Sequence, residues 1–276
     1  MRWALLLLFV VAAATFSFGV WGAQQTPVVV RYTLVMPGLS APLRIVQLSD
    51  SHASRIDMPP ERLAAIVAQA NALRPDIIVL TGDYVSGNPD HWTPAQTRTA
   101  LAPFRALRAP LGVFASLGNH DDLARTAAAL AGSAVQLLVG TGVDAGPLHI
   151  VGADEIDRGS PAVEAMRRAI RTAPPGKPVV VIAHQPTFFT WLQARPVVMF
   201  TGHTHGGQVK LPIIGAFAIN AYYAAHQRGV FRRGVHRMVV SSGLGTTGLP
   251  IRIGVPPEIV EVTLLPASAK PGDVPS

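Results

Sequence analysis

The chain has 276 residues, of which 49% are hydrophobic and 14% are charged, a balance that excludes an intrinsically disordered protein. It contains no cysteine, which excludes disulfides, thiolate catalysis and cysteine metal ligands. The formal charge of +7 favours anionic partners, either phosphorylated molecules or lipid headgroups, although a basic surface can also serve solubility alone. No basic stripe with interleaved aromatic residues indicates a nucleic-acid partner.

An uncharged apolar run extends from Trp3 to Ala23, directly after Met1 and Arg2. As a helix it spans about 30 Å, the thickness of a bilayer core, with Trp3 and Trp21 near the two interfaces. The run is long for a signal peptide, and Val20-Trp21-Gly22 near its end is only a mediocre cleavage site, so a retained transmembrane anchor is favoured over a cleaved signal. The basic residue before the run favours a cytoplasmic N-terminus, with the rest of the chain on the other side.

Apolar runs alternate with helical patterns along the rest of the chain. Strands are predicted at 28–36, 43–48, 76–80, 111–117, 135–139, 148–151, 178–183, 197–200, 238–241 and 259–264. Helices are predicted at 59–73, 93–107, 122–131, 160–171 and 187–193. The alternation predicts an α/β fold, and the unbroken apolar strands indicate that both faces of the sheet are buried. We expect an anchor at 1–23, one catalytic domain at 28–266 and a flexible tail at 267–276.

Five of the predicted strands end in clusters of Asp, Asn or His. The clusters are Asp50-Ser51-His52, Gly82-Asp83, Gly118-Asn119-His120-Asp121, His184, and Gly202-His203-Thr204-His205. The carboxyl ends of the strands in an α/β sheet border one crevice, so these clusters are expected to meet. Carboxylate, amide and imidazole groups are ligands for zinc, manganese or iron. The pattern therefore predicts a metal site.

Each cluster taken alone has an explanation that needs no metal. Asp50 can form a hydrogen-bonded turn, Gly82-Asp83 is a common turn, and a lone histidine such as His184 is more often a hydrogen-bonded core residue. His203 and His205 form the most specific pair, because two histidines at this spacing after a glycine rarely serve packing. The occurrence of all five clusters, each at a strand end, favours the metal site over five independent coincidences.

The series D-x-H, G-D, G-N-H-D, H and G-H-T-H resembles the calcineurin-like metallophosphoesterase superfamily, over residues 43–264. Four longer stretches resemble its membrane-anchored bacterial YkuE/YaeI-type branch. These stretches are Asn119-His120-Asp121, His184-Gln185-Pro186, the run from Gly202 to Gln208, and Ser242-Gly243-Leu244-Gly245 with Leu249-Pro250-Ile251-Arg252. The resemblance implies two packed mixed β-sheets flanked by helices in a four-layer sandwich.

The resemblance also implies a centre of two divalent ions, either Mn, Fe or Zn. It assigns Asp50, His52 and His205 to the first ion, Asn119, His184 and His203 to the second, and Asp83 to both. His120 is assigned to the phosphoryl oxygen and the leaving group rather than to a metal, and Asp121 either supports the site or caps a helix. The region after Asp83 lacks the additional aspartate of the protein phosphatases in this superfamily, which argues against that subtype.

The expected function is hydrolysis of phosphodiester or pyrophosphate bonds in a membrane-associated or lipid-linked substrate. Three alternatives are a UDP-2,3-diacylglucosamine-type pyrophosphatase specifically, a non-catalytic metal-binding scaffold, and a soluble cyclic-nucleotide phosphodiesterase. The mixture of aromatic residues and arginine at 213–233 suits either an amphiphile interface or an ordinary loop. We expect a monomer in the bacterial inner membrane, single-pass, with its catalytic domain on the extracytoplasmic side.

Overall fold

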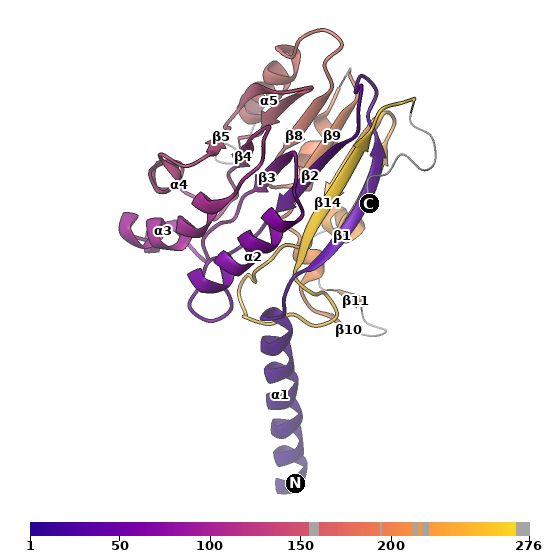
Figure 1. The fold of residues 1–276 in the computed structure, drawn as a ribbon. Helices are drawn as coiled ribbons and strands as arrows, with labels where there is room; N and C mark the ends of the chain where they lie inside the picture. The colour runs from indigo at the N-terminus through magenta and orange to yellow at the C-terminus, as the bar shows by residue number, and fades with distance from the viewer. Residues whose placement is uncertain (155–159, 194, 212–214, 217–220, 269–276) are drawn as a thin grey trace.

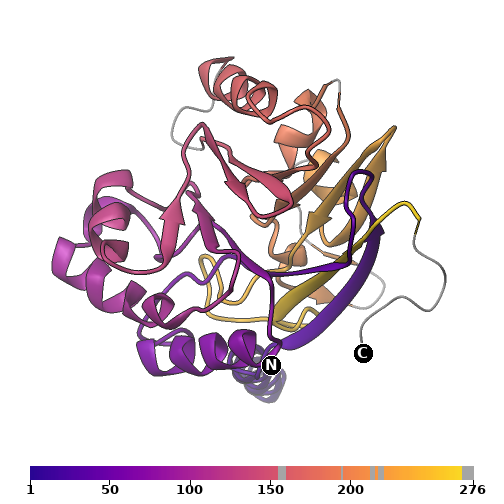
Figure 2. The same cartoon turned by 45° about the horizontal axis from the view of Figure 1, so that its top comes forward.

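The computed structural model describes residues 1–154, 160–193, 195–211, 215–216 and 221–268 (Figure 1). Two six-stranded mixed sheets pack face to face, and helices cover their outer faces (Figure 2). This arrangement confirms the predicted α/β fold of two packed sheets flanked by helices. Most of the tail predicted at 267–276, from residue 269 onward, lies outside the described residues.

The first sheet has the strand order β1-β14-β2-β3-β4-β5. Its strands are β1 (Val28–Val35), β2 (Leu43–Leu48), β3 (Ile77–Thr81), β4 (Val113–Ser116), β5 (Val135–Leu137) and β14 (Glu258–Leu265). Strands β2 to β5 are parallel to one another, whereas β14 is antiparallel to β2 and parallel to β1. The carboxyl ends of β2, β3 and β4 therefore lie at the edge where β1 begins.

The second sheet has the order β12-β13-β9-β8-β7-β6. Its strands are β6 (Thr141–Ala145), β7 (Leu148–Gly152), β8 (Val179–Ile182), β9 (Val197–Thr201), β12 (Gly229–Arg233) and β13 (His236–Val240). The four inner strands are parallel, and the two edge strands are antiparallel to their neighbours. A separate short pair consists of β10 (Lys210–Leu211) and β11 (Gly215–Ala216).

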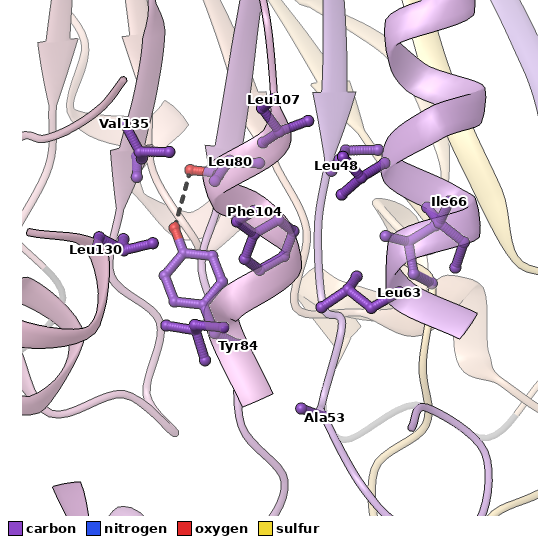
Figure 3. Packing of buried hydrophobic residues seen from close by; sticks show 14 of the residues in the cluster. Leu48, Ala53, Leu63, Ile66, Leu80, Tyr84, Phe104, Leu107, Leu130 and Val135 are labelled. Atoms are coloured by element: carbon purple, nitrogen blue, oxygen red, sulfur yellow. Dashed lines mark hydrogen bonds between the residues drawn. The ribbon is translucent and has the colours of Figure 1, made fainter. Parts of the chain in front are cut away.

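Alternate side chains of each inner strand contribute to different layers, because successive residues of a strand point to opposite faces. In β3, Ile77 and Val79 pack between the two sheets, while Ile78 and Leu80 pack under the helices (Figure 3). The helices over the first sheet are α2 (Pro60–Ala72), α3 (Pro94–Leu101) and α4 (Leu123–Leu130), and α5 (Ser160–Arg171) covers the second. Burial on both sides explains why these strands read as continuous apolar runs.

Helix α1 (Arg2–Ala23) projects away from the sandwich and is long and apolar enough to cross a membrane (Figure 1). Its last turns contact the domain closely: the Arg252 N–H donates to the Gly19 carbonyl at 2.8 Å, and a methyl group on Gly22 would lie 2.3 Å from the Arg252 carbonyl oxygen. The Gln24 amide donates to the Ile56 carbonyl at 3.1 Å. Since β1 begins just after α1, the helix leaves from the edge where β2, β3 and β4 end.

Several elements differ from the sequence-based expectation. The helix predicted at 93–107 ends at Leu101 and continues as the 3-10 helix η2 (Ala102–Ala106), because Pro103 has no N–H and its ring obstructs an α-helix. The helix predicted at 187–193 is the 3-10 helix η3 (Pro186–Trp191). The remaining short helices are η1 (Pro89–His91), η4 (His205–Gly207) and α6 (Ala221–Ala225).

Candidate metal centre

The loops after β2, β3, β4, β8 and β9 converge at one edge of the sandwich, and backbone hydrogen bonds join them. Asp50 N–H donates to the Gly82 carbonyl at 3.0 Å, and His52 N–H donates to the Asp83 carbonyl at 3.0 Å. Within the second sheet, Gly202 N–H donates to the His184 carbonyl at 2.9 Å. Between the two sheets, His203 N–H donates to Asp50 Oδ1 at 3.0 Å. The structure therefore brings the five sequence-predicted clusters together at one edge.

Asp50, His52 and His205 form a first group whose ligand atoms all lie within 4.8 Å of one another. All three are buried, and the Nε2 atoms of the two histidines are 3.1 Å apart. The His205 Nε2 atom is 3.4 Å from Asp50 Oδ1. Two imidazole nitrogens and a carboxylate oxygen that converge in this way could hold a metal ion.

Asp83, His184 and His203 form a second group, whose ligand atoms also lie within 4.8 Å of one another. The His184 Nδ1 atom contacts the Thr81 carbonyl at 2.9 Å, which leaves Nε2 directed at Asp83 Oδ2, 3.1 Å away. Asp83 Oδ2 is also 3.4 Å from the Nε2 atom of His52 in the first group, so this carboxylate lies between the two groups.

Asn119 supplies a test of whether the site suits a metal. Its Oδ1 atom is buried and has no hydrogen-bond partner among the described residues. A buried carbonyl oxygen without a partner is costly, and a cation at this place would satisfy it. Together with the carboxylate oxygen and imidazole nitrogens of the second group, this atom fits a divalent ion.

The backbone of the site is held in an uncommon conformation. Seven described non-glycine residues have positive φ, and five of them are candidate ligands: Asp50, His52, Asp83, His203 and His205. Each such residue costs on the order of 1–3 kcal/mol and persists only where its surroundings hold it. Two hydrogen bonds hold Asp50 in place: its carboxylate accepts from His203 N–H at 3.0 Å and from the Ser49 hydroxyl at 2.5 Å.

Burial and charge set the protonation of the candidate ligands. Burial lowers the pKa of His52 to about 4 and that of His205 well below its ordinary value, so both rings are neutral near pH 7. Burial raises the pKa of Asp50 to about 6. Burial also acts to raise the pKa of Asp83, but the adjacent His184 and His52 hold it well below its usual range.

These pKa values predict how metal binding depends on pH. A ligand must lose its proton to bind a metal, so binding is complete above the pKa of Asp50 and weakens as the pH falls through about 6. We expect the affinity of the first group to fall by about tenfold per pH unit below that value. Calorimetric titration of metal-free protein with Mn²⁺ or Zn²⁺ between pH 5 and 8 measures this, and an unchanged affinity at pH 5 would contradict it.

The sequence left open whether Asp121 supports the site or caps a helix, and the structure gives these two roles to Asp121 and Asp122 respectively. The buried Asp121 carboxylate accepts from the N–H groups of Asp83, Tyr84 and Gly118 at 2.7, 2.8 and 2.8 Å, so it joins the loops after β3 and β4. Asp122 caps helix α4 by accepting from the Arg125 N–H at 2.8 Å. Asp121 thus supports the site, and its neighbour is the cap.

Gly202 allows the loop after β9 to approach Asp50. A methyl group added to it would lie 2.1 Å from Asp50 Oδ2 and 2.0 Å from Ser49 Oγ, closer than atoms can pack. We expect Gly202→Ala to displace the Asp50 carboxylate and to weaken metal binding by at least about tenfold. Metal content per chain after dialysis measures the effect.

The control is Gly176→Ala, at a position where nothing lies within 4 Å of the added methyl group. This variant should lose some thermal stability, because φ is +76° at Gly176, but should keep its metal. Equal metal content in the two variants would contradict the role given to Gly202.

His120 lies beside the two groups but is oriented differently from the candidate ligands. Its Nδ1 atom contacts the Gly87 carbonyl at 2.5 Å, and its Nε2 atom is 4.0 Å from Asp83 Oδ2. The side chain is 27% exposed, whereas those of His52 and His184 are fully buried. The imidazole is therefore accessible to a molecule bound at the centre.

Two further residues at the site were not singled out from the sequence. The buried Arg252 guanidinium donates to the carbonyls of Gly245 and Ser242, at 2.6 and 2.7 Å through Nη2, and so holds the loop behind His205. The Tyr223 ring lies edge-on to His203, with centroids 4.8 Å apart. From the sequence, Arg252 was included in the stretch Leu249-Pro250-Ile251-Arg252 but was given no role. The only sequence signal for Tyr223 was the mixture of aromatic residues and arginine at 213–233.

Two adjoining groups of carboxylate and imidazole ligands at the carboxyl ends of sheet strands are typical of hydrolases that use two metal ions. A family model described as calcineurin-like phosphoesterase matches residues 43–207. The chain belongs to this family and is a metal-dependent phosphoester hydrolase.

Relatives match across most of the chain. It is 30% identical over 258 residues to the uncharacterized metallophosphoesterase YkuE of Bacillus subtilis, covering 87% of this chain and 85% of that protein. It is 29% identical over 231 residues to an uncharacterized metallophosphoesterase of Aquifex aeolicus, covering 80% and 85%. A zebrafish protein named transmembrane protein with metallophosphoesterase domain is 27% identical over 286 residues, covering 94% of this chain but only 62% of that longer protein.

Proposed function

We propose that this chain hydrolyses phosphodiester or pyrophosphate bonds of a lipid-linked substrate at a membrane surface. The observation that carries the proposal is the position of the metal centre, at the edge of the sandwich from which α1 leaves (Figure 1). If α1 crosses a bilayer, this edge faces the headgroups, so the phosphoryl group of a substrate in the same bilayer lies close to the site.

The roles proposed for the ligands follow the two groups. Asp50, His52 and His205 would hold one ion, Asn119, His184 and His203 the other, and Asp83 would contribute to both. The short distances from Asp83 Oδ2 to histidines of both groups support the shared role. Bound Mn, Fe or Zn ions would polarise the phosphoryl group and lower the pKa of a water molecule beside it.

His120 is proposed to act on the leaving group. The Gly87 carbonyl accepts from Nδ1–H, which leaves Nε2 directed towards the centre. When the ring is protonated on both nitrogens, Nε2–H can hydrogen-bond to a phosphoryl oxygen as charge develops there and can give its proton to the departing oxygen, which leaves the neutral Nδ1–H imidazole.

The organisation of the chain is proposed as an anchor at 1–23, a catalytic domain at 28–266 and a tail at 267–276. We place it as a monomer in the bacterial inner membrane, single-pass, with its catalytic domain on the extracytoplasmic side. The apolar helix and the relatives named as transmembrane proteins support the membrane assignment. A UDP-2,3-diacylglucosamine-type pyrophosphate is one specific candidate within the proposed substrate class.

The test uses the full chain in lipid nanodiscs, loaded with Mn²⁺, Fe²⁺ or Zn²⁺ in separate samples. Hydrolysis of an aryl phosphodiester is compared with that of the matching monoester, and then with that of phospholipids carried in the same discs. We expect the diester to be preferred and the lipid to be hydrolysed. Preference for the monoester would contradict the diesterase assignment, and no turnover with any ion would favour a metal-binding scaffold.

A further inference from the structure

A cavity of about 610 Å³ lies beside the metal centre, between the loop after His52 and helix α3. The apolar part of its wall is formed by Ala53, Met58, Pro60, Trp92, Ala95 and Ala100. The Trp92 ring is fixed on this wall, because its Nε1–H donates to the Ser86 carbonyl at 2.8 Å. The volume lies within the range of sites that bury small organic ligands. We call this space the side cavity.

The side cavity is continuous with the metal centre along the chain. Ala53 directly follows the candidate ligand His52, and its N–H donates to the Tyr84 carbonyl at 2.8 Å. Ser86, on the cavity wall, precedes Gly87, whose carbonyl contacts the imidazole of His120. The two segments that carry His52 and contact His120 thus continue directly into the wall of the side cavity.

The side cavity also lies on the face from which α1 leaves. The loop that lines it includes Ile56, which is 60% exposed and whose carbonyl accepts from the Gln24 amide at the end of α1. Leu249, in the loop on which Gly19 of α1 packs, is 58% exposed. Arg55 is exposed at the cavity and carries the positive charge that an anionic lipid headgroup attracts.

We propose that the side cavity receives the hydrocarbon chain of the substrate while the phosphoryl group occupies the metal centre. This inference rests on the function proposed above, and it narrows the substrate to a phosphodiester with an alkyl or acyl chain close to the phosphorus. None of the described residues that line the cavity is acidic, so no carboxylate on its wall repels the phosphate at the cavity mouth. Each methylene that passes from water into the cavity contributes up to about fourfold in affinity.

The first test measures kcat/KM for soluble alkyl aryl phosphodiesters with methyl, butyl and octyl chains, each below its micelle concentration. Monomeric substrates are required, because a chain that is already in a micelle gains nothing from the cavity. We expect kcat/KM to rise by at least about tenfold from methyl to octyl. Ala95→Phe, which fills the cavity from an exposed position on α3, should abolish this rise.

The matched control is Ala128→Phe, at an exposed position on α4 that is not part of the cavity wall. It should keep the full dependence on chain length. The inference is overturned if Ala95→Phe behaves like the unaltered chain at every length, or if Ala128→Phe loses the rise to the same extent.

A second test needs no turnover and separates this inference from the proposed function. The chain has four tryptophans, and replacing the other three by Phe leaves Trp92 as the only fluorophore of this type. A brominated octyl phosphate should quench Trp92 saturably in nanodiscs, and should not do so after Ala95→Phe. Quenching without diester hydrolysis supports chain binding in the side cavity and contradicts the proposed diesterase function. Diester hydrolysis with neither quenching nor dependence on chain length supports the proposed function and contradicts chain binding in the side cavity.

Discussion

Asp83→Asn is expected to lower kcat/KM by at least about 10³-fold, which corresponds to roughly 4 kcal/mol of transition-state stabilisation. Asparagine has the shape of aspartate and tolerates the positive φ of this position, so the backbone should remain in place. What changes is the charge and one oxygen of a group that lies against His52 and His184 at 3.4 and 3.1 Å. Both ions should therefore bind more weakly, and metal analysis of the purified variant should find less than two equivalents.

The control for this substitution is Asp122→Asn. Asp122 is the N-cap of α4, and asparagine caps a helix about as well as aspartate. Activity and metal content should remain those of the unaltered chain. If Asp83→Asn retained two equivalents of metal and most of its activity, the shared role of Asp83 would be wrong.

His120→Ala should lower kcat by about 10²–10⁴-fold while the metal content remains unchanged. The reason is that His120 approaches the centre from a partly exposed position, with Nε2 4.0 Å from Asp83. Because a proton donor matters most for a poor leaving group, the loss should be larger for an alkyl leaving group than for nitrophenol. Rates with both types of leaving group, together with elemental analysis, measure the effect.

His184→Ala is the comparison that separates the two kinds of histidine. It removes a fully buried candidate ligand of the second group and should reduce bound metal along with activity. Loss of a full metal equivalent from His120→Ala would show that His120 is a ligand. An equal loss of rate for both leaving groups would contradict its role as a proton donor.

The layers of the fold and the convergence of the polar clusters at the strand ends could be predicted because both depend on simple local patterns. The inner strands are buried on two sides, so runs such as Ile77–Thr81 are apolar throughout and end abruptly at a polar loop. Parallel strands then bring their carboxyl ends to one edge, whatever the separation in sequence. The edge strand β6 (Thr141–Ala145) escaped prediction because it contains glycine and aspartate and is formed by pairing with β7.

Other features of the site have no signal in the sequence. The identity of an aspartate or histidine does not predict that its backbone will adopt positive φ, because the loops that contact it impose that conformation. Gly202 has no positive φ, and the close approach of the Ser49 and Asp50 side chains in the folded chain explains the need for glycine there. The three N–H groups that surround Asp121 come from two different loops, and these become neighbours only in the folded chain.

The common position of α1 and the metal centre has a kinetic consequence. A chain that is anchored through α1 and a lipid in the same bilayer meet by lateral diffusion, so the concentration that matters is the number of lipids per unit of membrane area. Diluting the substrate with an inert lipid should slow turnover even when the amount per millilitre is constant. Adding more vesicles of the same composition should have no effect. Such an enzyme would respond to the local composition of its own membrane and not to the amount of lipid elsewhere in the cell.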